Sequence, residues 1–204
     1  MKLLFISLTN LCNRSCSYCP MAFWRNNPDF PNTLTLKKCI KAIELLDPTH
    51  VEITGGEPTM VPWLDDLTDY LDRLSIIYLV KSNGYRRCKN QVTAWHDGID
   101  SIPDNYDKIL IIHNMLDWQQ KYNYCTERSI PCAVIGKDTE TLGPHQKAAT
   151  FFLCPDGHLK ICHEQETNSI HNIDQVTDAK TVGWKVQCNK CKAVNDFFLF
   201  LEDK

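Results

Sequence analysis

Three cysteines stand close together near the N-terminus: Cys12, Cys16 and Cys19 lie within eight residues of one another. Thiolates at this spacing can hold three corners of an iron–sulfur cube. Clusters that only transfer electrons usually have four protein ligands, whereas a three-cysteine loop leaves one iron open to a small molecule. The spacing therefore predicts a 4Fe–4S cluster that takes part in chemistry.

The same spacing has two other interpretations. Positions i, i+4 and i+7 share one face of a helix, so the three thiols could be ordinary core residues. Asn13, Ser15 and Ser17 lie between them and are poor helix formers, which counts against a helix. Three sulfurs with one outside ligand could also bind zinc, and this alternative stays open.

A second set of cysteines stands in the last quarter of the chain: Cys154 with Cys162, and Cys188 with Cys191. Two such pairs can close on one tetrahedral metal site or on one cube. Four protein ligands saturate either site, so this set is expected to be structural or electron-transferring. The segment between the first two cysteines predicts a hairpin that turns at Asp156 and Gly157.

Composition narrows the class of protein. The chain has 204 residues, a net charge of -3 and eleven cysteines. This charge gives no overall attraction to nucleic acid or to an anionic membrane, and no apolar run approaches the length of a membrane span. An odd number of cysteines without an export signal favours metal binding in a reducing compartment over disulfides. We therefore expect a cytoplasmic protein that has no membrane partner.

Strand-like and helix-like segments alternate along the first two thirds of the chain. Helical spacing is expected over residues 36–46, with Thr35 as N-cap, and over residues 64–74, with Pro62 in the first turn. Strands are expected at residues 2–8, 51–54 and 76–80, and less regular ones at residues 99–102, 108–112 and 131–135.

Repeated strand–helix units predict an α/β fold with a parallel sheet. Residues 1–143 are too few for a full eight-unit barrel of about 250 residues, so we expect an open, partial TIM-like barrel of about six units. After Gly143 the periodicity stops. Residues 144–204 are therefore expected to form a small cysteine-rich appendage.

Two of the predicted strands end in segments suited to binding a ligand. Gly55 and Gly56 allow a close backbone approach, and the carboxylate of Glu57 can hold an ammonium group. Ser82 and Asn83 end the third strand. Sites in barrels are built at the carboxyl ends of the strands, so both segments are candidates for a site shared with the cysteine loop.

Residues 2–135 resemble the radical S-adenosylmethionine (SAM) superfamily, through the C-x3-C-x2-C spacing, the aromatic Tyr18 before the last cysteine and the Gly-Gly-Glu-Pro segment. The resemblance implies that the open iron binds SAM and that one electron cleaves SAM to methionine and a 5′-deoxyadenosyl radical. Tyr18 would then pack near the adenine. Gly55, Gly56 and Glu57 would grip the SAM amino group, and Ser82 and Asn83 would line the pocket.

The tail resembles the short "twitch" form of the SPASM appendage that follows many radical SAM barrels. The shared features are the four cysteines, the turn at Gly157 and the Ile-x-Asn-Ile stretch at residues 170–173. The resemblance implies a second, auxiliary 4Fe–4S cluster, with zinc as the alternative. A reductase such as flavodoxin or ferredoxin is the expected electron donor.

The resulting hypothesis is a radical SAM enzyme that takes a hydrogen atom from a substrate. A peptide is the first candidate substrate because SPASM-type appendages accompany peptide-modifying enzymes. A nucleoside, a nucleic-acid base or a small metabolite is the alternative. The candidate phosphate contacts are two basic pairs, Lys37 with Lys38 and Arg86 with Arg87, although solvated surface charge is their commoner role. A non-enzymatic iron–sulfur or zinc protein would explain the cysteines but not the Gly-Gly-Glu-Pro segment.

Overall fold

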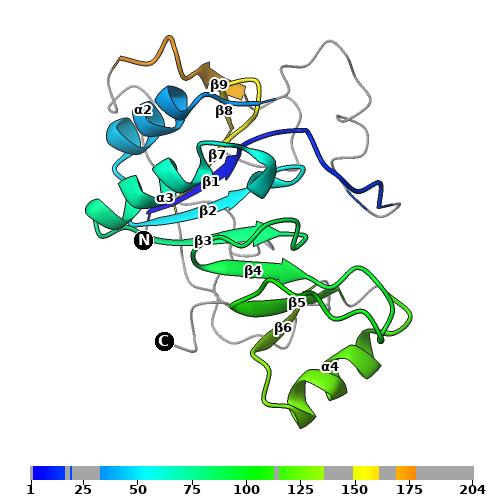
Figure 1. The fold of residues 1–204 in the computed structure, drawn as a ribbon. Coiled ribbons are helices and arrows are strands. Elements are labelled where there is room, and N and C mark those ends of the chain that lie inside the picture. The colour runs from blue at the N-terminus through cyan, green and yellow to red at the C-terminus, as the bar shows by residue number, and fades with distance from the viewer. Residues whose placement is uncertain are drawn as a thin grey trace.

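The computed structural model describes residues 2–16, 19, 33–112, 115–135, 149–160 and 169–177. Within these ranges the chain forms one mixed sheet with helices packed against it (Figure 1). The strands are β1 (Lys2–Ser7), β2 (His50–Thr54), β3 (Ile77–Ser82), β4 (Gln91–Ala94), β5 (Lys108–Ile112), β6 (Cys132–Ile135), β7 (Ala149–Leu153), β8 (His158–Lys160) and β9 (Ser169–Asn172). The helices are α2 (Leu36–Leu46), the short 3-10 helix η1 (Pro58–Met60), α3 (Leu64–Arg73) and α4 (Trp118–Glu127).

The strand order in the sheet is β6-β5-β4-β3-β2-β1-β7-β8-β9. All neighbours from β6 to β7 run parallel, and β8 and β9 continue the sheet antiparallel. The first six strands follow the chain in order, as expected for a partial barrel of strand–helix units. The predicted parallel α/β fold is therefore confirmed.

β1 lies inside the sheet between strands that are far away in the sequence. It pairs with β2 on one side, with Leu4 opposite Val51, and with β7 on the other, with Leu4 opposite Phe151. Phe5 stacks on Phe152 with 4.5 Å between ring centroids. The strand that precedes the cysteine loop is thus supported from both edges.

Helices α2 and α3 lie side by side over one face of β1, β2 and β3 (Figure 1). Their apolar residues, such as Ile43 and Leu67, form one core with Ile53 from the sheet. Thr35 caps α2 as predicted, since its side chain accepts a hydrogen bond from the backbone N–H of Lys38. α3 begins at Leu64, so Pro62 precedes the helix instead of standing in its first turn.

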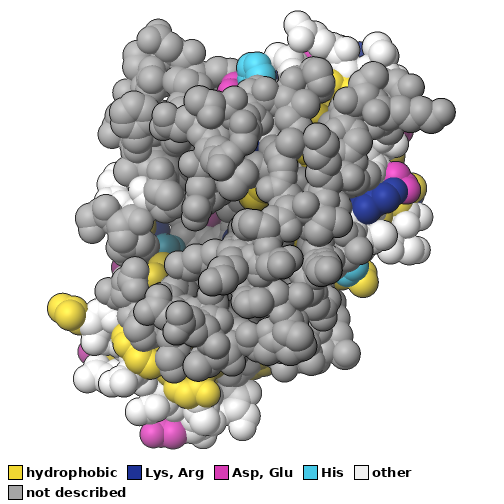
Figure 2. Space-filling model, turned by 180° about the vertical axis from the view of Figure 1, so that it is seen from behind, with side chains coloured by type: hydrophobic (Ala, Val, Ile, Leu, Met, Phe, Trp, Pro, Cys, Tyr) yellow, Lys and Arg dark blue, Asp and Glu magenta, His cyan; other side chains and the backbone are white. Residues whose placement is uncertain are grey.

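A second core lies at the other end of the sheet, where α4 packs on β5 and β6. Trp95 and Ile109 are fully buried in it. Seen from behind, hydrophobic side chains gather at the lower left, on the side where α4 lies after the half turn (Figure 2). Leu116 and Tyr122 from this part of the chain are exposed.

The expected strand at residues 99–102 is wrong. These residues lie in a turn region, and the strand of this unit is β4, which begins eight residues earlier at Gln91. Gln91 and Thr93 are polar but fully buried, because the Gln91 amide donates to Thr93 Oγ1 (2.9 Å) and to the Asn105 carbonyl (3.0 Å). A strand with polar inward positions gives no apolar alternation to detect.

The other expected strands and helices are confirmed, with boundaries shifted by one or two residues. None of the helices in the described part of the chain is long and apolar enough to cross a membrane.

Candidate active site

The cysteine loop begins directly after β1, at the carboxyl end of that strand (Figure 1). Cys12, Cys16 and Cys19 are free thiols and are all partly exposed. None of the three has helical backbone, so the interpretation as one face of a helix is wrong. The three thiols are therefore available to a ligand at the edge of the sheet.

The Gly-Gly-Glu segment after β2 docks onto this loop through backbone hydrogen bonds. The Gly56 N–H donates to the Thr9 carbonyl at 2.5 Å, and the Glu57 N–H donates to the Leu11 carbonyl at 2.7 Å. A Cβ on Gly56 would lie 2.1 Å from the Leu11 oxygen, and one on Gly55 would lie 2.7 Å from the Thr9 oxygen. The glycines are thus required because the two backbones approach each other closely.

The carboxylate of Glu57 is fully buried and accepts hydrogen bonds from two neighbouring segments. One oxygen accepts from the Thr59 N–H (3.0 Å), the Thr59 hydroxyl and the Ser82 hydroxyl (2.8 Å). The other oxygen accepts from the Asn83 N–H at 2.7 Å. Glu57 therefore ties the end of β2 to the end of β3, and in this structure its oxygens are directed at protein donors.

Asn83 connects this pair of strand ends to the cysteine loop. Its amide nitrogen lies 2.8 Å from the Asn13 side-chain oxygen and 3.6 Å from the Cys12 sulfur. Five residues predicted for the site, Cys12, Gly56, Glu57, Ser82 and Asn83, are thus joined by direct contacts or by one intervening residue. They come from the ends of three adjacent parallel strands, where barrel enzymes place their sites.

The structure adds two residues that sequence reasoning missed, His96 and Asp97, which follow β4. The Nδ1 atom of His96 lies 3.8 Å from the Cys16 sulfur. Asp97 forms a two-point ion pair with Arg14 of the cysteine loop, with N–O distances of 3.0 and 2.9 Å. A His-Asp dipeptide carries little signal, and the misplaced fourth strand hid the fact that it stands at a strand end.

Two pKa values reflect this arrangement. Burial, together with the positive charge of Arg14, lowers the pKa of His96 to about 4, so the imidazole is neutral near neutral pH. The hydrogen bond from Arg14 lowers the pKa of Asp97 below its ordinary value. The cysteine loop is therefore held by an ionised carboxylate, and a neutral imidazole lies next to Cys16.

The donor set of this loop fits an iron–sulfur cluster. The Cys12 sulfur lies near two N–H groups, the Arg14 backbone at 3.4 Å and the Asn83 amide at 3.6 Å, and such donors stabilise a thiolate ligand. The side chains in the described ranges do not form a closed group of three or more metal ligands. The loop thus offers three accessible thiols at one edge of the sheet without a prearranged metal cage.

The second cysteine set is described only at Cys154, which follows β7 and is half-buried. The predicted hairpin turn is confirmed, since the Gly157 N–H donates to the Cys154 carbonyl at 2.8 Å and Gly157 has a φ of 84°. Burial raises the pKa of Cys154 to about 11. Tyr18, Cys162, Cys188 and Cys191 lie outside the described residues.

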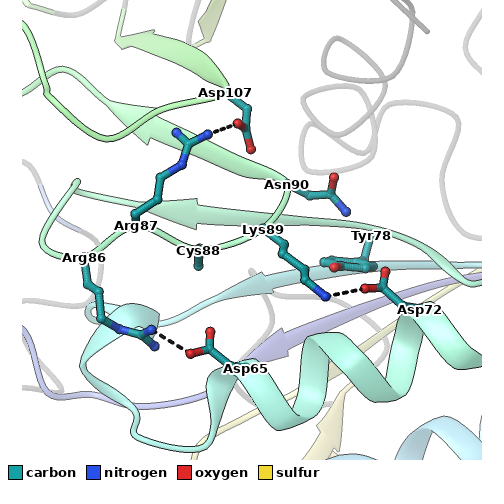
Figure 3. A pocket seen from close by; sticks show the side chains of 9 residues that line it. All are labelled: Asp65, Asp72, Tyr78, Arg86, Arg87, Cys88, Lys89, Asn90 and Asp107. Carbon is teal, nitrogen blue, oxygen red and sulfur yellow. Dashed lines mark hydrogen bonds and ion pairs between the residues drawn. The ribbon is translucent and has the colours of Figure 1, made fainter.

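A pocket of about 520 Å³ lies elsewhere, between α3 and the loop that joins β3 to β4 (Figure 3). Its cations are paired with carboxylates: Arg86 with Asp65 at 2.8 Å, and Arg87 with Asp107. Lys89 likewise pairs with Asp72 at 2.9 Å. The carboxylates neutralise the positive charge that would attract a phosphate, so Arg86 and Arg87 are engaged in ion pairs instead.

Comparison with known proteins identifies the class. The sequence profile of the radical SAM superfamily matches residues 6–151, which is more than half of the chain. The chain therefore belongs to the radical SAM superfamily and is an enzyme of that class. Membership implies a 4Fe–4S cluster and SAM as cofactors.

Among curated proteins, the chain is similar to GTP 3′,8-cyclases. It is 31% identical over 110 residues to that of Pasteurella multocida, a match that covers 51% of this chain and 32% of the relative. It is 30% identical over 114 residues to that of Vibrio parahaemolyticus, covering 51% of this chain and 33% of the relative. The matches thus span about a third of these relatives' length.

Among solved structures, the chain is similar in fold to SuiB of Streptococcus suis. The SAM-bound form gives a TM-score of 0.63 at 14% identity and covers 88% of this chain and 65% of that one. The form bound to the precursor peptide SuiA gives a TM-score of 0.54 at 12% identity, covering 98% and 66%. At this identity the likeness establishes the shared fold.

Proposed function

We propose that Cys12, Cys16 and Cys19 hold the cluster, and that the enzyme cleaves SAM reductively and takes a hydrogen atom from its substrate. The observation that carries this proposal is the junction of three strand ends, in which Asn83 reaches the Cys12 sulfur while its backbone N–H is bound by Glu57. An isolated zinc loop or electron-transfer loop would not need this connection.

In this proposal the chain's own residues bind and orient the cofactors. The bound cluster and SAM together supply the electron transfer and the 5′-deoxyadenosyl radical. Gly55, Gly56 and Glu57 form the segment that holds the SAM amino group, and Ser82 and Asn83 line the same pocket, with Tyr18 near the adenine. Because the Glu57 carboxylate has protein partners, it acts by fixing the backbone of both segments.

The proposed substrate is a peptide, and a nucleotide or nucleoside is the second candidate. The name of the structural neighbour SuiB, solved with a precursor peptide, favours the first. The names of the curated relatives, GTP 3′,8-cyclases, favour the second, although they are matched over about a third of their length. The two classes differ in charge and size, so one assay can separate them.

The C-terminal region is proposed to form a second functional unit, whose strands β7 to β9 continue the sheet of the barrel. Residues 1–143 would be the catalytic partial barrel, and residues 144–204 a twitch-like segment in which Cys154, Cys162, Cys188 and Cys191 hold an auxiliary 4Fe–4S cluster or zinc. A flavodoxin- or ferredoxin-type reductase would supply the electrons. The iron and zinc contents of the wild type are compared with those of a variant that lacks all four of these cysteines. The metal that the variant loses is the one bound in this region.

The decisive experiment is anaerobic reconstitution with iron and sulfide, followed by incubation with SAM and a strong reductant. We expect 5′-deoxyadenosine from the wild-type protein and none from Cys12→Ala, Cys16→Ala or Cys19→Ala. Cys39→Ala is the matched control, because Cys39 is fully buried on α2 and is not one of the loop cysteines. Product from the three variants, or none from the wild type, would contradict the proposal.

The substrate is then tested with the active enzyme. The enzyme is incubated with a peptide library in one assay and with nucleoside triphosphates in another. We expect the peptides to stimulate the formation of 5′-deoxyadenosine. Stimulation by nucleotides alone would replace the peptide with the second candidate.

A further inference from the structure

The turn after β4 touches the cysteine loop at two points. His96 Nδ1 lies 3.8 Å from the Cys16 sulfur, and Asp97 binds both terminal nitrogens of Arg14. Arg14 stands between Cys12 and Cys16, so the ion pair fixes the middle of the loop and brings Cys16 to the imidazole. Both contacts come from a strand end that is separate from the Gly-Gly-Glu and Ser-Asn segments.

The turn that presents His96 is held firmly by its own contacts. Trp95 is fully buried, and its indole N–H donates to the Gly98 carbonyl at 3.2 Å, which closes the turn around His96 and Asp97. Lys121 from α4 is also fully buried, and its ammonium donates to the Trp95 carbonyl at 3.3 Å. The same ammonium pairs with Asp117 at 3.1 Å. A buried cation with these partners leaves the backbone at residue 95 little freedom to move.

We propose that His96 is a positioning residue that donates a hydrogen bond from Nδ1 to the Cys16 sulfur and raises the reduction potential of the cluster. This inference rests on the proposed function, because it requires Cys16 to be a cluster ligand. N–H donors to cluster sulfurs are one of the levers that set the potential of an iron–sulfur centre. The reduced cluster carries one more negative charge, so a donor stabilises it more than the oxidised cluster.

The chemistry of this class gives such a donor a purpose. The cluster must accept an electron before SAM is cleaved. A higher reduction potential makes this step easier when the protein that supplies the electron is a weak reductant. The three cysteines have different surroundings: Cys12 is near the Asn83 amide, whereas Cys16 is near His96. The sulfurs of Cys12 and Cys16 thus each lie near a side-chain nitrogen, and the two nitrogens come from different strand ends.

The test is a redox titration of the anaerobically reconstituted full chain, with the reduced cluster followed by electron paramagnetic resonance. In His96→Phe we expect about a tenfold lower ratio of reduced to oxidised cluster at a fixed potential, which equals about 59 mV for a one-electron couple. His96→Asn keeps an N–H near the position of Nδ1 and should restore most of the wild-type ratio. His50→Phe, at the opposite end of β2, is the matched control and should match the wild type.

Iron content separates a tuning role from a purely structural one. An unchanged potential in iron-loaded His96→Phe overturns the inference, as does an equal loss in the Phe and Asn variants. If His96→Phe does not bind iron, wild-type protein labelled with ¹⁵N-histidine decides the question. A ¹⁵N coupling to the reduced cluster that is retained in His50→Phe supports the inference, and no coupling overturns it. A wild-type protein without a cluster would instead refute the proposed function.

Discussion

The side-chain amide of Asn83 lies 3.6 Å from the sulfur of Cys12, although the two residues are 71 positions apart in the chain. The same nitrogen lies 2.8 Å from the Asn13 oxygen, and the Asn83 backbone N–H donates to Glu57. One residue therefore connects the ends of β1, β2 and β3 at the edge where the cofactors are proposed to bind.

Replacing Asn83 with Ala removes the amide bridge but keeps the backbone hydrogen bond to Glu57. We expect lower iron and sulfide content after reconstitution and weaker SAM binding, while the melting temperature changes little. The loss of a partly exposed hydrogen bond costs only about 0.5–1.5 kcal/mol. Gln120→Ala, on the exposed face of α4, is the control. Wild-type iron content and SAM affinity in the Asn83 variant would show that the bridge is dispensable.

Glu57→Gln tests the buried carboxylate. The substitution places an NH₂ group among donors from Thr59, Ser82 and Asn83, so at least one buried donor loses its acceptor. We expect the free energy of unfolding to fall by about 1–3 kcal/mol in chemical denaturation. Glu44→Gln, which affects an exposed hydrogen bond to Tyr70, should change stability by less than about 1 kcal/mol. Equal effects of the two substitutions would contradict the role of Glu57 as a link between strand ends.

Gly56→Ala tests the close approach of two backbones. The new methyl group would lie 2.1 Å from the Leu11 oxygen, so the cysteine loop or the segment after β2 must move. Overpacking of this kind costs about 1–3 kcal/mol and should also lower iron incorporation. Gly98→Ala is a suitable comparison, since a Cβ there meets no atom within 4 Å, and its effect should stay within about 0.5 kcal/mol. Thermal melts and iron analysis of both variants provide the measurement, and a well-folded, iron-loaded Gly56→Ala protein would refute the argument.

Alkylation of the metal-free protein should separate the cysteines into two groups. Burial raises the pKa of Cys39 and Cys125 to about 12, and both side chains are fully buried, so neither forms a reactive thiolate at about pH 8. Cys12, Cys16 and Cys19 are partly exposed and should react with iodoacetamide first. Peptide mapping by mass spectrometry under anaerobic conditions gives the order of labelling. Reconstitution should then protect the loop cysteines, and early labelling of Cys39 would show that the core opens readily.

Much of the fold could be predicted because its signals are local. The helical spacing of α2, the Thr35 cap and the apolar strands before Gly55 and Ser82 depend on neighbouring residues only. β4 was misplaced because its buried positions Gln91 and Thr93 are polar and are satisfied by partners that only the folded chain brings near. Interior hydrogen bonding of this kind is invisible to a hydrophobic pattern.

The parts of the candidate site that belong to a sequence motif were predicted. The parts that come together only through the fold were missed. The cysteine spacing and the glycine pair pointed to the loop and to the segment after β2. His96 and Asp97 have no distinctive spacing, and their contacts to Cys16 and Arg14 cross 80 and 83 positions of the sequence. The partners of Glu57 were equally hidden, because a carboxylate beside two glycines suits a bound ammonium as well as a ring of buried donors.

The pairing of β1 with both β2 and β7 has a consequence for biosynthesis. During translation the first strand emerges early, but one of its edges stays open until residues 149–153 leave the ribosome. An exposed parallel edge of apolar residues such as Leu4 and Ile6 invites pairing with other chains. The nascent protein is therefore expected to depend on chaperones during this interval, and a chain truncated before Ala149 should aggregate.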